Sequence, residues 1–281
     1  MKDLGYYNGK YDVIDNMYVP MNDRACFFGD GIFEVAYVRN YKIYALDEHL
    51  NRMYKSAAYL KYNMPLSKEE FASLLNKLSL KVDSPDQLLY WQVSRGTAMR
   101  SHAPQSELTA NIWVTVTPKV MLPPDIPMKL ITFPDTRFYH CNMKTLNLLP
   151  TVMASIAARE AGADEAVFHR NEIVTECAHS NLCIIRNDGA IQTAPADELI
   201  LPGVTRAHMV SACHELGVEC VESPFTIKEM MNAAEVVVIT SGAQFRPVQY
   251  VDGIHVGGRA PELVKLFQDK MYGDFLKRTD S

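Results

Sequence analysis

Four prolines fall within the ten residues 118–127. Proline fixes φ and cannot donate a backbone hydrogen bond, so such a stretch continues neither a helix nor the centre of a sheet. It favours an extended, semi-rigid connector between folded parts. We therefore predict a domain over 1–117, a connector over 118–127 and a second domain over 128–281. The length of 281 residues agrees with about two domains.

The predicted N-terminal domain shows strands followed by helices. The Asn8-Gly9 turn predicts a hairpin over 6–11. Asp47 predicts the start of a helix that runs to about residue 62, and Ser67 to Glu70 forms a capping box for the next helix. Further strands are expected over 88–94 and 112–117. This order predicts a small domain of the α+β type.

The predicted C-terminal domain is larger and richer in strands. Alternating and β-branched segments predict single strands and hairpins, and helical spacing with Gly162 or Gly217 behind it predicts helices. The expected strands and hairpins lie at 129–133, 165–176, 181–194 and 235–240, and the expected helices at 148–160, 204–216 and 260–276. We predict an α/β domain.

Composition excludes several classes of protein. The formal charge of −5 and pI near 5.9 give no long-range attraction for nucleic acid or an anionic membrane surface. The first residues lack the apolar core of a signal peptide, and no apolar run is long enough to span a bilayer. The six cysteines form no CxxC pair and the eight histidines no HExxH pattern. We expect a cytoplasmic protein with reduced thiols and no metal.

Lys144 is the candidate catalytic residue. It lies in an apolar run that we expect to open a helix. A lysine amine that is partly shielded from water loses its proton more readily and can attack an aldehyde. The alternative is an ordinary solvated lysine whose stem covers apolar surface. Glu176, about thirty residues further on, and the loops behind it favour the catalytic interpretation.

Three features point to a bound phosphate. A glycine turn before Val204 and Thr205 places two backbone amides and a hydroxyl at the start of a predicted helix, where anions bind. Thr240 and Ser241 end a predicted strand with two further hydroxyls. Arg52 offers a fixed positive charge. Each feature alone has an ordinary alternative as a cap, a turn or a surface charge.

Taken together, these residues resemble the fold type IV family of pyridoxal 5′-phosphate (PLP) enzymes. The blocks that carry the resemblance cover nearly the whole chain. They are Phe28-Gly29-Asp30-Gly31 with Glu34, Glu48-His49 with Arg52, Met143-Lys144-Thr145-Leu146-Asn147, Asp164-Glu165-Ala166, Val174-Thr175-Glu176, Ser180-Asn181 and Leu201-Pro202-Gly203-Val204-Thr205-Arg206. The family contains branched-chain and D-amino acid aminotransferases, aminodeoxychorismate lyases and R-selective amine transaminases.

The resemblance implies a role for each candidate residue. Lys144 would carry PLP as a Schiff base and act as the base that moves the substrate's Cα proton. Glu176 would face the pyridine nitrogen, where a carboxylate favours the protonated ring. Arg52, Val204, Thr205 and Ser241 would hold the phosphate. The full cofactor-binding set is Arg52, Lys144, Glu176, Ser180, Asn181, Leu201, Val204, Thr205, Thr240 and Ser241.

Substrate handedness depends on where the carboxylate is held, since the Cα–H bond must point at the lysine. Arg100-Ser101-His102 resembles the Arg-x-His trap of D-amino acid aminotransferases, which reaches into the site of the partner subunit and so implies a homodimer. Phe33 departs from that pattern, which has a tyrosine there, and His179 and Ala243 depart from it as well. Losing one hydrogen bond would weaken carboxylate binding by about 1 to 2 kcal/mol.

The sequence therefore predicts a homodimeric PLP-dependent transaminase that moves the amino group of D-alanine, D-glutamate or D-aspartate to a 2-keto acid by a ping-pong mechanism. Phe33, Arg100 and His102 are the expected substrate-binding residues. The alternatives on the same fold are a branched-chain L-amino acid aminotransferase, an R-selective amine transaminase and a 4-amino-4-deoxychorismate lyase. A non-catalytic phosphate-binding protein is a further class, but it would need neither Lys144 nor Glu176.

Overall fold

The computed structural model describes residues 1–104 and 107–280. The chain forms two compact units, and neither is continuous in sequence. The first contains Met1–Met121, the segment Met143–Asn147 and the chain from Arg278 onward. The second contains Leu122–Asn142 and Leu148–Lys277. The domain bounds expected from the proline-rich stretch stay a prediction.

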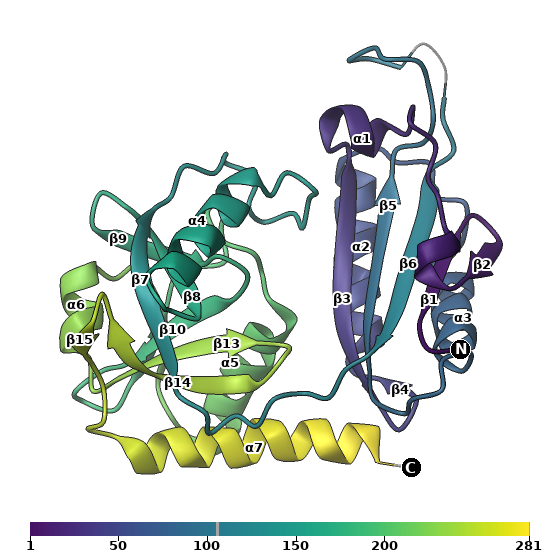
Figure 1. Ribbon diagram of the computed structural model, residues 1–281. Coiled ribbons are helices and arrows are strands. Elements are labelled where there is room, and N and C mark those ends of the chain that lie inside the picture. The colour runs from purple at the N-terminus through teal and green to yellow at the C-terminus, as the bar shows by residue number, and fades with distance from the viewer. Residues whose placement is uncertain (105–106, 281) are drawn as a thin grey trace. The chain divides into compact units, whose positions relative to one another are not determined.

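The first unit is built on one six-stranded antiparallel sheet in the order β2-β1-β6-β5-β3-β4. Its strands are β1 (Leu4–Tyr7), β2 (Lys10–Asp12), β3 (Gly31–Arg39), β4 (Lys42–Ile43), β5 (Gln87–Ser94) and β6 (Asn111–Pro118). Its helices are α1 (Arg24–Phe28), α2 (Leu46–Tyr59) and α3 (Lys68–Ser79), with a 3₁₀ turn at Ile14–Asn16. Helices α2 and α3 lie on one face of the sheet (Figure 1).

Helical spacing explains how α2 and α3 cover that face. Leu50, Met53 and Ala57 recur at intervals of three and four on α2, and all three are buried. Phe71 and Leu75 do the same on α3, which begins with the predicted capping box. These side chains and the sheet form one continuous apolar core.

Two details of this unit differ from the sequence prediction. Helix α2 begins at Leu46 after the left-handed Ala45, so Asp47 lies in the first turn and does not cap it. The Asp47 carboxylate instead binds Lys68 and Asn51. The short helix α1 was not predicted, because its five residues carry no helical periodicity; Asp23 caps it and the left-handed Gly29 ends it.

The second unit contains a nine-stranded mixed sheet, in which β7 pairs in parallel with β14 and β8. Its strands are β7 (Met128–Pro134), β8 (Glu165–Arg170), β9 (Ile173–Cys177), β10 (Asn181–Ile185), β11 (Ile191–Thr193), β12 (Cys220–Glu222), β13 (Glu235–Thr240), β14 (Gln244–Val251) and β15 (Ile254–His255). Its helices are α4 (Leu149–Glu160), α5 (Val204–Leu216), α6 (Ile227–Asn232) and α7 (Pro261–Thr279), whose last residues belong to the first unit. The predicted strands and helices of this half are confirmed, as is the mixed fold.

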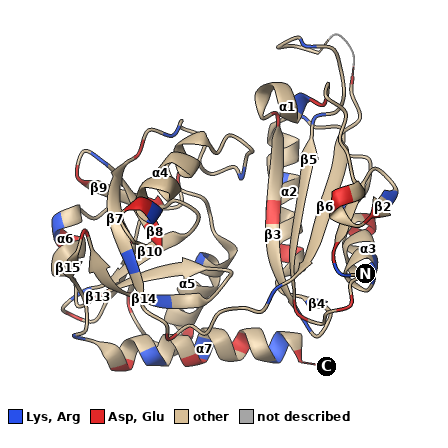
Figure 2. Cartoon of the chain, in the orientation of Figure 1, with Lys and Arg blue, Asp and Glu red and all other residues tan. Residues whose placement is uncertain are grey.

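Apolar clusters lie on both sides of the central strand β13. Val236 and Val238 face one cluster, whereas Val237 and Ile239 face the other, where α5 and α7 pack. At the surface, acidic and basic residues alternate along α7 (Figure 2). No helix among the described residues is long and apolar enough to cross a membrane.

Candidate active site

Lys144 is held beside the first residues of β3. The Phe33 amide donates to the Lys144 carbonyl at 2.9 Å, and the Leu146 amide donates to the Gly31 carbonyl at 3.0 Å. Thr145 completes the pairing through a bridge to Ile32. The expectation that this segment opens a helix is wrong in detail, because its backbone extends β-type pairing and α4 begins only at Leu149.

The Lys144 side chain lies against an aromatic surface. Its Nζ atom is 4.3 Å from the centroid of the Phe33 ring. Phe33 is 9 % exposed and stacks on Tyr90 with a centroid distance of 5.4 Å. The amine is therefore half-buried against a ring that shields one of its sides from water.

Arg52 forms a buried ion pair in the same unit. Its Nε and Nη2 atoms donate to the two carboxylate oxygens of Glu34 at 2.8 and 2.6 Å. His49 Nδ1 lies 2.8 Å from the same carboxylate. Burial raises the pKa of Glu34, but Arg52 and His49 outweigh that effect and lower it to about 2. The planar Arg52 guanidinium is thus fixed in orientation by a charged partner.

Glu176 is the buried carboxylate of the second unit, near the end of β9. Its Oε2 atom accepts hydrogen bonds from Asn181 Nδ2 at 2.9 Å and from the Leu201 amide at 3.1 Å. Its Oε1 atom accepts from Arg137 Nη1 at 2.5 Å. Two residues of the predicted set, Asn181 and Leu201, therefore contact Glu176 and hold its carboxylate.

Arg137 is a site residue that the sequence analysis missed. It also donates to Asp135, which Arg170 approaches as well. Burial lowers the pKa of Arg137, but the bonds to Asp135 and the charge of Glu176 outweigh it and raise the pKa above its ordinary value. The sequence feature that could have identified Arg137 is its spacing from Asp135, two residues earlier, directly after the predicted strand 129–133.

The start of α5 has the properties of an anion site. Gly203 precedes the helix without any side-chain cap, so the first backbone amides of the helix remain available to an anion. Thr205 Oγ1 and Ser241 Oγ lie 3.3 Å apart and bring the two predicted loops together. Thr240, one residue earlier, accepts from the Gly242 amide and shapes that second loop. A Cβ atom at Gly203 would lie 2.0 Å from Asn181 Oδ1, so only glycine fits there.

Ser180 binds a buried carboxylate of its own unit, that of Glu165. Its hydroxyl donates to Glu165 at 3.0 Å, and the His179 amide donates to the other oxygen of that carboxylate at 2.7 Å. Burial raises the pKa of Glu165. The His179 side chain itself is 60 % exposed. Ser180 therefore fixes the turn between β9 and β10, next to Asn181.

Arg100 and His102 lie on the loop that joins β5 to β6, and both are exposed. The Arg100 guanidinium and the His102 ring each lie 5.2 Å from the centroid of Phe28, at the end of α1. The structure thus places the two residues of the predicted trap on one aromatic ring of the first unit.

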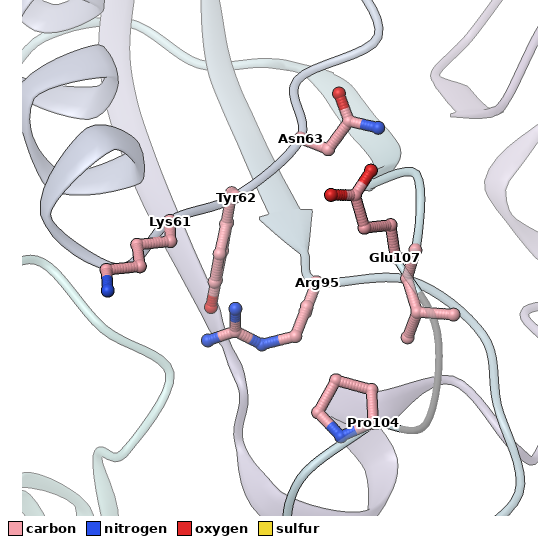
Figure 3. A pocket seen from close by; sticks show the side chains of 7 residues that line it. Lys61, Tyr62, Asn63, Arg95, Pro104 and Glu107 are labelled. Atoms are coloured by element: carbon pink, nitrogen blue, oxygen red, sulfur yellow. The ribbon is translucent and has the colours of Figure 1, made fainter.

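A pocket of about 640 Å³ opens at the base of the same loop. Arg95 lies over the Tyr62 ring at 4.6 Å in its floor (Figure 3). Asp30 accepts hydrogen bonds from both Arg95 and Tyr62. The pocket is also lined by Lys61, Asn63, Pro104, Glu107 and Leu108.

These groups fit PLP by their chemistry. The cofactor needs an amine for its aldehyde, a carboxylate for its ring nitrogen and anion donors for its phosphate. The chain offers an amine in Lys144, a buried and fixed carboxylate in Glu176, and backbone amides and hydroxyls at the uncapped start of α5 with Thr205 and Ser241. Among the described residues, no cluster of three or more His, Cys, Asp or Glu side chains is arranged to hold a metal ion.

Comparison with known proteins agrees with this chemistry. Residues 31–251 match the family described as amino-transferase class IV. A D-alanine aminotransferase of Bacillus licheniformis is 35 % identical over 276 residues, which cover 97 % of each chain. That of Listeria monocytogenes serotype 4b is 35 % identical over 262 residues, 89 % of each chain.

The fold has close structural neighbours. The branched-chain amino acid aminotransferase of Escherichia coli superimposes with a TM-score of 0.89 at 21 % identity, covering all of this chain and 97 % of that one. This likeness confirms the predicted fold type IV architecture. The family match over most of the chain, together with the 35 % identity to a curated relative over 97 % of its length, places the chain in the class IV aminotransferases, which are PLP-dependent enzymes.

Proposed function

We propose that this enzyme transfers the amino group of D-amino acids, with D-alanine as a good donor, to a 2-keto acid. The observation that carries the proposal is the loop with Arg100 and His102, which brings a guanidinium and an imidazole each to 5.2 Å from the centroid of the Phe28 ring. Such a pair suits a carboxylate. The similarity to D-alanine aminotransferases over 97 % and 89 % of the chain supports the same substrate class.

Bound PLP supplies an electron sink that stabilises negative charge at the substrate's Cα. In this proposal, Lys144 would hold the cofactor, and its amine would carry the substrate's Cα proton. Glu176 acts at the ring nitrogen, with its orientation set by Arg137, Asn181 and Leu201. Donor and acceptor would use the same site in turn, so the kinetics would be ping-pong.

The phosphate donors are proposed to come from the start of α5 and from neighbouring hydroxyls. Val204 and Thr205 offer backbone amides, and Thr205 and Ser241 offer adjacent hydroxyls. Arg52 would add a guanidinium whose orientation is set by Glu34. Because the Arg52 pair with Glu34 is nearly neutral overall, we expect the amides and hydroxyls to provide most of the phosphate binding.

Arg100 and His102 are proposed to serve the active site of a partner subunit, which makes a homodimer the functional unit. Both side chains are exposed, as residues that act on another subunit must be before assembly. We also place the enzyme in the cytoplasm. Its cysteines, Cys26, Cys141, Cys177, Cys183, Cys213 and Cys220, are all unpaired, which fits a reducing compartment.

Phe33 favours a second candidate. A phenylalanine beside the lysine offers no hydroxyl to a carboxylate, and this suits a branched-chain L-amino acid or a simple R-amine as donor. The structural likeness to a branched-chain enzyme concerns the fold and does not decide the substrate. A 4-amino-4-deoxychorismate lyase would use the same lysine and release pyruvate, so product analysis separates it.

The experiment is the absorption spectrum of the PLP-loaded enzyme, recorded before and after addition of D-alanine or L-leucine in separate samples. We expect D-alanine to convert the lysine-bound form to the pyridoxamine form and L-leucine to leave it unchanged. Conversion by L-leucine alone would indicate a branched-chain L-amino acid aminotransferase. It would also reduce Arg100 and His102 to ordinary loop residues.

A further inference from the structure

The loop that carries Arg100 and His102 is fastened to α1 and to the residues just before it on both sides of Arg100. At its beginning, the Arg24 amide donates to the Gly96 carbonyl at 3.0 Å. The Ala98 amide donates to the Asn22 carbonyl at 3.1 Å. The loop therefore leaves β5 paired to the chain that enters α1.

The second fastening is made by one side chain, Arg24. Its Nη1 atom donates to the Ser101 carbonyl at 2.6 Å, and its Nη2 atom donates to the His102 carbonyl at 2.9 Å. These two carbonyls follow directly after Arg100. A planar guanidinium with two parallel donors fixes both the position and the direction of the peptide that it binds.

Arg24 is itself held rigidly. Its side chain is 4 % exposed, its Nε atom donates to Asp30 at 2.8 Å, and its guanidinium lies 4.8 Å from the Phe28 ring. Arg100 and His102 lie on that same ring. Burial raises the pKa of Asp30, but the bonds from Arg95 and Arg24 outweigh this and lower it, so the anchoring carboxylate stays charged.

The start of α1 is anchored to the sheet in turn. Asp23 accepts hydrogen bonds from Ser94 at 2.9 Å and from Asn111 at 2.8 Å, at the adjoining ends of β5 and β6. It also caps α1 by accepting from the Ala25 amide. A continuous set of buried contacts therefore runs from the sheet through α1 and Arg24 to the peptide beside Arg100.

We propose that Arg24 is a positioning residue for substrate recognition: by fixing the Ser101 and His102 carbonyls it sets the direction in which Arg100 and His102 meet the substrate carboxylate. This inference deepens the proposed function and depends on it. Arg24 would not touch the substrate. It would lower the entropy that the trap loses when a carboxylate binds, so it would act on KM for amino acids.

The chain offers a matched control in Arg95. Like Arg24, it donates to Asp30 through Nε at 2.8 Å, but its other bond goes to the Leu60 carbonyl and not to the trap. Arg24→Gln and Arg95→Gln each remove one charged partner of Asp30. Only Arg24→Gln also releases the peptide beside Arg100.

The test compares wild type, Arg24→Gln, Arg24→Lys, Arg95→Gln and Arg100→Ala, all loaded with PLP. We expect Arg24→Gln to raise KM for D-alanine about tenfold, equivalent to the loss of one charged hydrogen bond. The rate at which hydroxylamine, a carboxylate-free nucleophile, attacks the cofactor aldehyde should not change. Arg95→Gln should leave both quantities unchanged.

A second readout does not depend on activity. Trypsin should cleave after Arg100 faster in Arg24→Gln than in wild type or Arg95→Gln, because the peptide has lost its fastening. Arg24→Lys keeps the charge beside Asp30 and protects the fold, but it has one donor centre. It should therefore give an intermediate KM, and a wild-type KM in this variant would overturn the inference.

The outcomes separate the two proposals. If Arg100→Ala raises KM for D-alanine and a folded Arg24→Gln does not, positioning by Arg24 is wrong and the proposed function stands. Equal losses with D-alanine and hydroxylamine would show a general structural defect and overturn the inference too. If wild type does not use D-alanine, the proposed function fails, while the trypsin comparison still decides whether Arg24 orders the loop.

Discussion

Arg137 and Glu176 form a buried ion pair, with 2.5 Å between Nη1 and Oε1 and side chains that are 11 % and 6 % exposed. The carboxylate proposed to meet the cofactor ring is therefore already bound by a cation of its own chain. Removing one partner of such a pair leaves an uncompensated buried charge. We expect Arg137→Gln to lower the free energy of unfolding by about 3 kcal/mol.

Urea unfolding of the cofactor-free protein measures this loss. Arg170→Gln is the control, because Arg170 also forms an ion pair with Asp135, at 3.2 Å, and its side chain is more exposed than that of Arg137, 18 % against 11 %. Arg170→Gln should lower the free energy of unfolding clearly less than Arg137→Gln does. Equal losses in the two variants would mean that the Asp135 contact, and not the Glu176 pair, carries the stability.

Lys144→Ala should abolish transamination and leave a folded protein, since the backbone pairing of this segment with β3 does not use the side chain. Borohydride reduction followed by mass spectrometry should fix a pyridoxyl group on Lys144 in wild type. It should fix none at position 144 in the variant. Lys61→Ala, at an exposed lysine of the same unit, should behave as wild type. Turnover retained by Lys144→Ala would remove its catalytic role.

Arg100→Ala should raise KM for D-alanine by roughly tenfold to a hundredfold, the range expected for loss of a charge-assisted hydrogen bond to a carboxylate. A carboxylate-free R-amine lacks the group that Arg100 binds, so its KM should not change. Steady-state kinetics with both donors test this. A similar rise for both would show that Arg100 does not bind the carboxylate.

Phe33→Tyr should lower KM for D-alanine modestly, by no more than about tenfold, because a hydroxyl would be added beside the Lys144 amine. The stack on Tyr90 can be kept, since the ring is unchanged. The measurement is KM for D-alanine with kcat determined alongside. An unchanged KM would mean that this edge of the ring does not face the carboxylate.

Acid stability should depend on Glu34. Arg52 and His49 lower its pKa to about 2 against the effect of burial, compared with an ordinary value of 4.5. A lowered pKa stabilises the folded state above pH 4.5, and this contribution is lost as the pH falls from 4.5 towards 2. The contribution is about 3 kcal/mol.

Denaturant unfolding at a series of pH values tests that dependence. In Glu34→Gln the group cannot ionise, so unfolding free energy should fall less steeply across this pH range. The variant should also be less stable than wild type at neutral pH, where its partners Arg52 and His49 have lost their carboxylate. If the unfolding free energy of the variant falls as steeply with decreasing pH as that of wild type, other carboxylates cause the acid sensitivity.

Local chemistry made much of the fold predictable. The Asn8-Gly9 turn and the capping box at Ser67 lie where the sequence placed them, because each depends on neighbouring residues alone. Asp47 shows the limit of this reasoning. A left-handed Ala45 starts α2 earlier, and no local signal in the sequence marks that conformation.

The site residues also fall into two groups: those that local sequence identifies and those that depend on distant partners. Residues in recognisable blocks, such as Lys144 and Glu176, could be named from sequence, although their roles stay predictions. Arg24 and Arg137 could not, because their significance comes from partners that lie 77 and 39 residues away. The apolar run at Lys144 does not itself open the predicted helix, because its backbone pairs with β3 and α4 begins only at Leu149.

Gly203 has a consequence for how this enzyme can vary. A single added methyl group there would collide with Asn181 Oδ1, and the Asn181 amide nitrogen binds Glu176. Position 203 therefore controls two separate properties at once: the geometry of the helix start and the setting of a buried acid. A side chain at this position would therefore disturb the anion donors and the buried acid together.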